Sequence, residues 1–360
     1  MKKIILSAGG TGGHIFPMVA LYEGLKQENH DIMLITDIRV EKYINNLNIK
    51  FKLVDAASPF GKKYFIYGIF TISKIIKSIF QSYKILKKFK PDLVIGCGGY
   101  VSFSVLIASK LLGIKIILYE TNSVLGRVNK IFSKYSSKII TGYKDPIKLN
   151  KKYIDKTFYV GQLIRKNILS INIDLKKIKK DQINLLVLGG SQGANVFSKS
   201  LPRILKKLLI KNISIHVFHQ SNNKDVNYIT EEYKKIQNKK NFSFDVFTFE
   251  PDIQKYYKFS NLVICRSGSS TLSELCAIRL PFIAIPLPSS LDNHQYFNAK
   301  FYADNDCGWL IKQDTDLENN LYNKLNYIFQ NYNEEISKKA ENFNKIMKKD
   351  TLANFLKLLN

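Results

Sequence analysis

Short apolar runs recur along the chain and alternate with segments of helical spacing, a pattern typical of an α/β fold. In the first half, runs of strand length occur at residues 2–7, 31–36, 92–96, 115–119, 138–141 and 157–160. In the second half they occur at residues 185–188, 213–219, 244–247, 262–265 and 281–285. The pattern therefore predicts two consecutive α/β halves.

Glycine-rich turns follow the first strand of each half and open a helix. Ala-Gly-Gly-Thr-Gly-Gly occupies residues 8–13 and Gly-Gly-Ser-Gln-Gly-Ala occupies residues 189–194. A further turn, Cys-Gly-Gly-Tyr-Val-Ser, occupies residues 97–102. A strand, a glycine turn, a helix and a second strand form the opening of a Rossmann-type half, in which ligands bind at the carboxyl ends of the strands.

The expected architecture is two Rossmann-like domains that face each other across a cleft. At 360 residues the chain is long enough for two domains, each with its own core. We place the first domain at residues 1–161 and the second at residues 162–335. The remainder, 336–360, is expected to be a helix that packs back on the first domain.

Residues 262–299 have the outline of a nucleotide-sugar site. Arg-Ser-Gly-Ser-Ser-Thr follows an apolar run and precedes a helix expected from Leu272 to Ile278. Small residues at a helix N-terminus favour anions, and Glu274 in the first turn is placed to accept hydrogen bonds from sugar hydroxyls. Taken alone, however, the segment also fits an ordinary βαβ unit with a serine-rich turn.

The charge balance changes this picture little. The 55 basic and 29 acidic residues give a net charge of +26, which invites a nucleic-acid interpretation. Nearly all of the basic residues are lysines, whereas arginine is the better sign of phosphate or base recognition. We therefore predict no nucleic-acid partner, and expect the charge to favour anionic lipid.

Neither a metal site nor a membrane span is indicated. The four cysteines are widely spaced without a Cys-x-x-Cys pair, which suggests neither a zinc site nor a disulfide framework. The apolar run at the N-terminus is short and broken by glycines, so it is interpreted as a strand rather than a signal peptide. Because no run reaches about 18 apolar residues, no spanning helix is expected, and we predict a cytosolic location.

The stretch from Phe60 to Lys90 alternates bulky apolar residues with lysines. Helical spacing is shared by Ile69, Ile72, Ile76, Ile79, Tyr83 and Leu86, so for about half of this stretch one apolar stripe is expected to pack into the domain core. The remaining aromatic residues exceed what one stripe buries. An apolar surface rimmed by lysines suits adsorption to an anionic membrane, and we predict such contact here.

An ordered set of motifs resembles the MurG family of bacterial glycosyltransferases. The motifs, which extend from about residue 4 to residue 310, are GGTGGHIFP (9–17), GGYVS (98–102), ETNSVLGRVNK (120–130), GGSQGA (189–194), CRSGSSTLSE (265–274) and DNHQYFNA (292–299). The resemblance implies a two-domain GT-B fold and transfer of N-acetylglucosamine from UDP-N-acetylglucosamine to lipid I, giving lipid II for peptidoglycan. Lipid I is undecaprenyl-pyrophosphoryl-N-acetylmuramoyl-pentapeptide. The reaction is expected to invert the sugar carbon without a metal or another cofactor.

The same resemblance implies where the protein works and which residues bind substrate. The enzyme is expected to be peripheral on the cytoplasmic face of the inner membrane, where it can meet other cell-wall synthesis proteins. Near the substrate phosphates and the donor sugar it places Thr11, Gly12, Gly13 and Asn122. The rest of the donor site is assigned to Arg165, Ser191, Ser269, Ser270, Thr271, Leu272, Ser273, Glu274 and Gln295.

The chemistry of inversion is consistent with these assignments. A base must take the proton from the attacking hydroxyl, and His14 is the candidate because a helix start disfavours imidazolium. A histidine that only caps a turn has the same pattern. Hydroxyls and N–H groups at Ser191 and Ser269–Thr271 would meet the leaving diphosphate. Glu274 is assigned to the ribose hydroxyls, and Gln295 to the 4-hydroxyl that separates gluco from galacto donors.

Three departures from the family pattern accompany the match. Gly-Gln-Leu-Ile-Arg stands at 161–165 where the family commonly has GNPVR, and Tyr-Glu-Thr-Asn stands at 119–122 where it has HEQN. Phe249 and Glu250 replace a more apolar pair beside the expected uracil position.

Other functions fit the sequence less well. Another GT-B enzyme, such as a diacylglycerol glycosyltransferase, is the nearest alternative, and GGTGGH together with GGYVS argues against it. A nicotinamide-dependent dehydrogenase would need a better dinucleotide fingerprint than the first turn offers, with Asp37 as its acidic residue.

Overall fold

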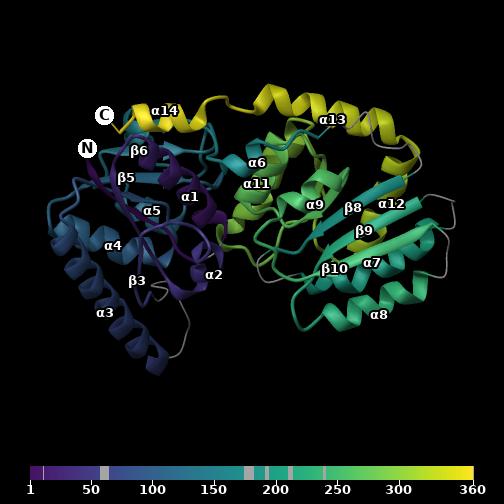
Figure 1. Cartoon of the computed structure of the whole chain (residues 1–360), viewed down its shortest axis with the longest axis horizontal. Coiled ribbons are helices and arrows are strands. Elements are labelled where there is room, and N and C mark those ends of the chain that lie inside the picture. The colour runs from purple at the N-terminus through teal and green to yellow at the C-terminus, as the bar shows by residue number, and fades with distance from the viewer. Residues whose placement is uncertain are drawn as a thin grey trace. The chain divides into compact units, whose positions relative to one another are not determined.

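The computed structural model describes residues 1–10, 12–56, 65–173, 182–190, 194–209, 214–237 and 241–359, without the side chains of Lys42, Gln237 and residues 65–70. The chain divides into two compact units. Unit 1 comprises Met1–Arg165 and Lys348–Asn360, and unit 2 comprises Lys166–Met347. Each unit is an α/β domain built on its own parallel sheet (Figure 1).

Unit 1 contains a seven-stranded parallel sheet in the order β3-β2-β1-β4-β5-β6-β7. Its strands are β1 (Lys3–Ser7), β2 (Asp31–Thr36), β3 (Phe51–Leu53), β4 (Leu93–Gly96), β5 (Lys115–Glu120), β6 (Lys138–Thr141) and β7 (Thr157–Tyr159). The central strand β4 is buried along its whole length, as expected for a parallel sheet covered on both faces. Because the chain reverses its direction across the sheet after β3, the point between β1 and β4 is a topological switch point.

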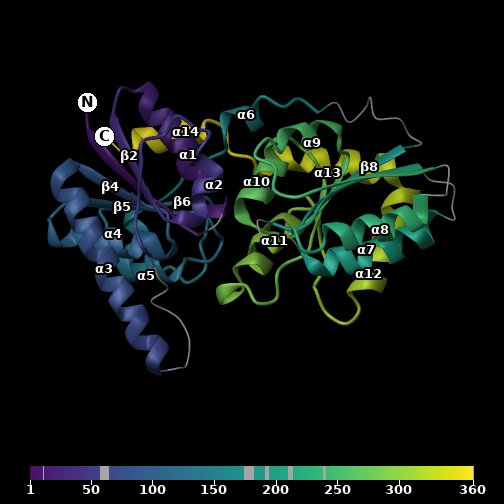
Figure 2. The same cartoon turned by 60° about the horizontal axis from the view of Figure 1, so that its bottom comes forward.

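Helices cover both faces of this sheet. They are α1 (Gly12–Gln27), α2 (Glu41–Ile44), α3 (Phe65–Phe89), α4 (Gly99–Leu111), α5 (Arg127–Phe132) and α14 (Thr351–Lys357), with short 3₁₀ helices η1 (Ile38–Val40) and η2 (Lys151–Lys156). Helices α3, α4 and α5 lie on one face, and α1 and α14 lie on the other (Figures 1 and 2). Leu86, Val105 and Phe132 supply buried side chains from the first group to the core.

The C-terminal segment is bonded to unit 1 at several points. The Nζ atoms of Lys2 and Lys138 donate to the carbonyl oxygens of Leu359 and Leu358, at 2.8 and 2.5 Å. A Cβ placed on Gly24 of α1 would lie 2.7 Å from a Leu352 side-chain carbon, so α1 and α14 are closely packed at this glycine. The returning segment therefore completes the face of the sheet that α1 covers.

Unit 2 contains a six-stranded parallel sheet in the order β10-β9-β8-β11-β12-β13. Its strands are β8 (Gln182–Leu188), β9 (Ser214–Gln220), β10 (Phe242–Phe247), β11 (Leu262–Cys265), β12 (Phe282–Ala284) and β13 (Trp309–Leu310). The first strand again lies inside the sheet, between β9 and β11, so unit 2 has its own switch point.

The helices of unit 2 are α6 (Lys166–Leu169), α7 (Asn195–Leu208), α8 (Val226–Gln237), α9 (Gln254–Phe259), α10 (Ser269–Ala277), α11 (His294–Asp304), α12 (Leu317–Gln330) and α13 (Tyr332–Ile346), with the 3₁₀ helix η5 (Leu291–Asn293). Helices α7, α8 and α12 pack their apolar stripes on one face of the sheet through residues such as Leu201, Tyr233 and Leu325. Helices α9 and α13 lie on the opposite side (Figure 2).

Helix α3 buries only part of the stripe that its apolar spacing predicts, since Leu86 is fully buried and Tyr83 packs against the core. Ile72, Ile76 and Phe80 are 57%, 60% and 62% exposed. The buried positions include Ser78 and Ser82, whose small side chains allow close packing against the neighbouring α4. The expectation that Ile72 and Ile76 enter the core is therefore wrong, and they form an exposed apolar row instead.

The ends of several elements also differ from expectation. The short strands β3 and β13 are absent from the sequence-based assignment, and α10 begins at Ser269 rather than at Leu272. Residues 336–346 belong to α13 in unit 2, and the chain returns to unit 1 at Lys348. The return therefore starts 12 residues later than position 336.

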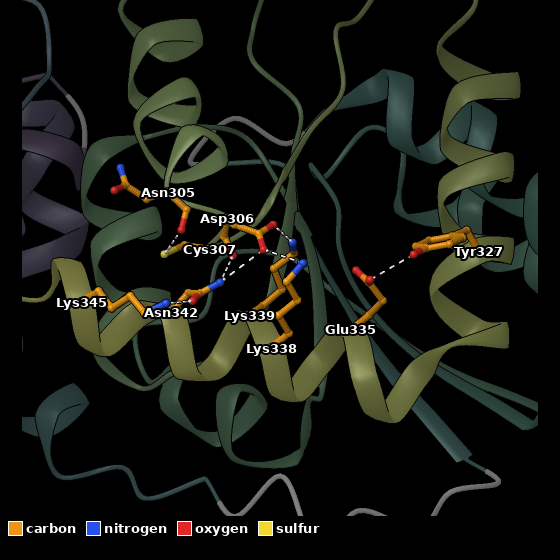
Figure 3. A network of polar contacts seen from close by, with 9 residues as sticks. All are labelled: Asn305, Asp306, Cys307, Tyr327, Glu335, Lys338, Lys339, Asn342 and Lys345. Atoms are coloured by element: carbon orange, nitrogen blue, oxygen red, sulfur yellow. Dashed lines mark hydrogen bonds and ion pairs between the residues drawn. The ribbon is translucent and has the colours of Figure 1, made fainter.

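A polar network holds α13 against the loop before β13 (Figure 3). The Nζ of Lys339, whose side chain is only 4% exposed, forms an ion pair with Asp306 and lies 4.9 Å from the centre of the Trp309 ring. Lys338 contacts the second carboxylate oxygen at 3.0 Å, and the Asn342 amide donates to the Asp306 carbonyl oxygen at 3.0 Å. Burial raises the pKa of Asp306, but hydrogen bonds from Lys339 and Lys338 outweigh it, so the pKa is lowered.

Asp306→Asn should destabilise unit 2 by about 2 kcal/mol at pH 7, because the buried Lys339 ammonium loses its charged partner. Since folding lowers the pKa of Asp306, its stabilisation is present above the unfolded pKa and lost as pH falls through the folded one. Urea unfolding at pH 7 and near pH 3 should therefore show the two proteins converging in acid. The control is Asp304→Asn at the exposed Lys300 pair, which should cost less than about 1 kcal/mol. Equal losses in both variants would contradict the assignment.

Candidate active site

Two backbone turns meet at the switch point of unit 1. The turn after β1 contains Gly9 and Gly10, and the turn after β4 contains Gly98 and Gly99. Gly99 has a φ of +78°, and a Cβ on it would lie 2.9 Å from the carbonyl oxygen of Gly9. The buried Ser102 hydroxyl lies 2.8 Å from the Ser7 carbonyl oxygen and 2.6 Å from that of Gly98. The two turns thus pack backbone to backbone.

His14 lies beside this contact. It is the third residue of α1 and is half-buried. A Cβ on Gly98 would lie 3.6 Å from His14 Cε1 and 3.7 Å from the amide nitrogen of Asn129. The imidazole is therefore held over the β4 turn at the carboxyl edge of the sheet, the position expected of a catalytic group in this class of fold.

Asp37 at the end of β2 fixes the first turn from the other side. Its buried carboxylate accepts hydrogen bonds from Gly10 N at 3.1 Å and from Arg39 N at 2.9 Å. The Arg39 guanidinium donates to both carboxylate oxygens, at 2.9 and 2.8 Å. A dinucleotide-binding enzyme would need this acid for the ribose, whereas here it bonds the protein's own turn and an arginine. The geometry therefore counts against the dehydrogenase alternative.

Glu120 organises the loop between β5 and α5. Its buried carboxylate accepts four N–H groups, from the backbone and side chain of Asn122, from Gly126 N and from the Asn129 amide, at 2.8–3.2 Å. Burial raises the pKa of Glu120 and these hydrogen bonds oppose the rise. Asn122, the predicted contact to the donor sugar, is thus oriented by a carboxylate two residues before it.

Arg165 lies against α1 rather than in open solvent. Its guanidinium carbon is 3.9 Å from the centre of the Phe16 ring, within range for a cation–π interaction. The same ring covers Gly12, since a Cβ there would lie 2.8 Å from Phe16 Cε2. Gly13 follows in the first turn of α1. Phe16 therefore joins Arg165 to the start of the helix that carries His14.

In unit 2 the predicted donor residues follow neighbouring strands. β11 lies between β8 and β12, so the Gly190 turn, the start of α10 and the segment leading to Gln295 share one edge of the sheet. Arg266 donates from a guanidinium nitrogen to the carbonyl oxygens of Ile285 and Pro286, at 3.1 and 3.3 Å. Burial lowers the pKa of Arg266 to about 10. Arg266 therefore ties β11 to the end of β12, while it lies under the turn at Gly190.

The serine-rich segment forms the first turn of α10 and not a loop before it. Ser269 and Ser270 are almost fully buried, and Thr271 is half-buried. Leu272 points into the core, and the Ser273 hydroxyl donates to the Ser270 carbonyl oxygen at 3.0 Å. Of the expected ligands, Leu272 and Ser273 therefore have side chains that contact the protein: Leu272 packs in the core, and Ser273 bonds the helix backbone.

Glu274 and Gln295 both make contacts that sequence reasoning did not predict. Glu274 lies in the second turn of α10 with 5% of its surface exposed, and the Tyr257 hydroxyl donates to it at 3.2 Å. It therefore lies one turn further along the helix than the first-turn position that was expected. The Gln295 Oε1 accepts from Leu287 N at 2.9 Å, which turns the amide NH₂ away from that loop. The preceding residues Asp292 and Asn293 both have left-handed backbone angles, with φ of 53° and 58°.

Comparison with known proteins identifies the family. The glycosyltransferase family 28 N-terminal domain matches residues 4–141, and the C-terminal domain of that family matches residues 184–354. A Rickettsia bellii enzyme named UDP-N-acetylglucosamine–N-acetylmuramyl-(pentapeptide) pyrophosphoryl-undecaprenol N-acetylglucosamine transferase is 37% identical, with 92% of each chain covered. A Pelagibacter ubique enzyme of the same name is 36% identical over 94% of this chain and 92% of its own. The crystal structure of Acinetobacter baumannii MurG matches with a TM-score of 0.76 at 26% identity, over 99% of both chains.

The chain belongs to the MurG family of glycosyltransferases. The comparisons confirm the predicted fold class, two Rossmann-like domains of the GT-B type, and the predicted enzyme class.

The expected site residues of this MurG-family chain fall into two groups. Gly12, Gly13, His14, Asn122 and Arg165 belong to unit 1, and Ser269–Glu274 and Gln295 belong to unit 2. Thr11 and Ser191 lie outside the described residues. No group of three or more His, Cys, Asp or Glu side chains that could hold a metal ion occurs in the described part of the chain.

Sequence reasoning missed the residues that orient the others. Glu120 stood inside a recognised motif without a role, and Asp37 was considered only as a ribose ligand. Ser102 and Asn129 were not singled out. One signal was present, since each carboxylate directly follows or ends a buried strand.

Gly99→Ala should reduce transfer activity roughly 10²-fold, because the new methyl group would push apart the turns on which His14 rests. The matched control is Gly113→Ala, whose φ is +68° but whose Cβ would meet nothing within 4 Å. That variant should lose about 1–2 kcal/mol of stability from backbone strain alone and keep its activity. Steady-state kinetics and thermal unfolding of both variants test the difference. Equal activity in the two variants would show that contact between the turns is unimportant.

Proposed function

We propose that this protein transfers N-acetylglucosamine from UDP-N-acetylglucosamine to the 4-hydroxyl of the N-acetylmuramoyl unit of lipid I, giving lipid II. The observation that carries the proposal is the similarity, along nearly the whole chain, to enzymes whose names state this donor sugar and acceptor. The arrangement of side chains in each unit supports it independently.

His14 is the proposed general base. Attack by the acceptor hydroxyl on the anomeric carbon forms one C–O bond while the bond to the diphosphate breaks, and the hydroxyl proton passes to an imidazole nitrogen. The position of His14 near the N-terminus of α1 favours the neutral ring, which can accept that proton. The ring lies so close to Gly98 that a Cβ there would come within 3.6 Å of its Cε1 atom, so the glycine turn helps to define its position before substrate binds.

The proposed donor site lies at the start of α10. The N-terminal end of a helix carries a partial positive charge that favours an anion such as a diphosphate. Ser269, Ser270 and Thr271 form the first turn of α10, and the half-buried Thr271 also carries a hydroxyl group. The Gln295 amide is proposed to read the sugar 4-hydroxyl with its NH₂ group, since its oxygen is bonded to Leu287.

Glu274 and Arg165 are also proposed to contact the donor, although their surroundings in the protein differ from those expected. Because Glu274 is buried beside Tyr257, a contact with ribose requires the sugar to enter close to α10. Arg165 offers a cation beside α1, held by the Phe16 ring. Asn122 is proposed to face the donor sugar in the orientation that Glu120 imposes.

We also propose that unit 1 binds an anionic membrane surface through α3, which would place the enzyme at the cytoplasmic face of the inner membrane. Ile72, Ile76 and Phe80 form an exposed row, and Lys84 continues it with its Nζ 5.2 Å from the centre of the Phe80 ring. An apolar row beside lysines favours adsorption to acidic lipid. Residues 60–64 of the predicted segment 60–90, and the side chains of residues 65–70, lie outside the described part of the chain. Among the described residues, no helix combines the length and hydropathy that crossing a bilayer requires.

The test of the reaction is transfer of labelled N-acetylglucosamine to a short-chain lipid I analogue in the presence of diacylglycerol. Labelled product on the lipid I analogue alone is expected. Transfer to diacylglycerol with none to lipid I would overturn the proposal in favour of another GT-B transferase.

His14→Ala should lower kcat by ~10²–10⁴, the usual contribution of a general base, while binding of UDP stays unchanged. His30→Ala is the control, because His30 accepts a backbone hydrogen bond at the opposite end of the sheet. That variant should turn over within about twofold of wild type. Near-normal turnover of the His14 variant would remove it from the base role.

Replacing Ile76 and Phe80 together by glutamate should weaken binding to phosphatidylglycerol vesicles at least tenfold, since each exposed apolar side chain contributes about 1.5–3 kcal/mol when buried in lipid. Turnover of a water-soluble acceptor should not change. Phe259→Glu in unit 2 is the control, because Phe259 is equally exposed, at 65%. Vesicle co-sedimentation measures the effect, and an equal loss in the control would refute a specific role for α3.

A further inference from the structure

Tyr119 bonds residues 161–165 to the carboxyl edge of the unit 1 sheet. These residues lead from unit 1 into unit 2 and are called the linker below. Tyr119 lies in β5, has no exposed surface, and precedes Glu120. Its hydroxyl accepts a hydrogen bond from Leu163 N at 3.0 Å and donates to the Gly161 carbonyl oxygen at 3.3 Å. Burial raises the pKa of Tyr119, so the phenol remains protonated and able to donate. The Tyr119 hydroxyl therefore bridges two backbone groups of the linker, at Gly161 and Leu163.

Gln162 reinforces the same attachment from the linker side. Its buried amide donates to the Thr121 carbonyl oxygen at 2.8 Å. The amide lies directly over Gly142, where any Cβ would approach within 2.3 Å of its nitrogen. The linker is thus bonded to residues on both sides of Glu120. The two departures from the family pattern, at residues 119–122 and 161–165, consequently contact each other and form one structure.

The segment by which the chain returns to unit 1, which begins at Lys348, lies beside Gly161. Gly161 has a φ of +91°, and a Cβ on it would lie 2.8 Å from Lys348 Cβ and 3.0 Å from Thr351 Cγ2. The Tyr119 ring packs edge-on against Phe355 of α14, with ring centres 5.2 Å apart. Tyr119 therefore contacts both segments of unit 1 that lead to unit 2.

Two residues after Leu163, the linker places Arg165 on the Phe16 ring. The backbone at Gly161 and Leu163 sets where Arg165 leaves the sheet, and the Tyr119 hydroxyl fixes both. Resting on the proposed function, in which Arg165 contacts the donor, we propose that Tyr119 is a positioning residue for donor binding. It acts by holding residues 161–165 so that the Arg165 guanidinium stays on Phe16.

Tyr119→Phe tests the proposal, because it removes the hydroxyl and keeps the ring on Phe355. We expect the KM for UDP-N-acetylglucosamine to rise about 5- to 10-fold with kcat within about twofold, the result of lost binding rather than lost chemistry. In an Arg165→Ala background the same change should alter KM less than twofold, since both act through one contact.

Tyr233→Phe is the matched control. Tyr233 is equally buried, and its hydroxyl bonds His219 at 2.8 Å in unit 2. A similar loss of thermal stability with unchanged KM is expected there. If the Tyr119 variant also loses only stability, or if its effect on KM adds fully to that of Arg165→Ala, the positioning role is wrong.

Amide hydrogen exchange separates this inference from the proposed reaction. The Leu163 amide should exchange about 5- to 10-fold faster in the Tyr119→Phe protein and at the wild-type rate in the Tyr233→Phe protein. Unchanged exchange at Leu163 would overturn the inference whether or not the enzyme is active. Absence of transfer by the wild-type protein, with faster exchange in the variant, would instead refute the proposed reaction and leave the linker attachment supported.

Discussion

Contact between the backbones of two glycine turns is the constraint on which the geometry of unit 1 depends. A parallel sheet with its first strand beside β4 brings the turns after β1 and β4 together at one edge, and Gly9 and Gly99 then touch without side chains between them. His14 rests on the result. Any side chain at Gly99 would separate the turns, so the position of the proposed base depends on glycine at residue 99.

Buried carboxylates carry the next level of organisation. Asp37 binds the N–H groups of the first turn, and Glu120 binds those of the loop after β5. A buried carboxylate must be satisfied by donors, so each one imposes a single conformation on the backbone around it. Unit 2 obtains similar order from a cation, because Arg266 ties together the ends of two strands. In both units, charged side chains that need not touch substrate shape the edge that would bind it.

The strands were predictable because burial on both faces demands continuous apolar runs, as at Asp31–Thr36 and Leu262–Cys265. β3 and β13 were not, because three and two residues leave no periodic signal. Helical spacing identified the apolar residues of α3 but not which of them face the core. Small residues such as Ser78 can replace apolar ones where helices pack closely. The candidate site was predictable in outline from its motifs. The partners of Glu274 and Gln295 were not, because Tyr257 and Leu287 meet them only through the tertiary fold.

The return of the chain to unit 1 has a consequence for how the protein forms during synthesis. Unit 2 is one continuous stretch, Lys166–Met347, whereas unit 1 also needs Lys348–Asn360. While the ribosome is still translating unit 2, Gly24 of α1 lacks its neighbour Leu352, and the Tyr119 ring lacks its neighbour Phe355. Domains generally fold as they emerge, first to last. Here the first domain to be made is the last to be completed, and its apolar surface remains open to chaperones until α14 arrives.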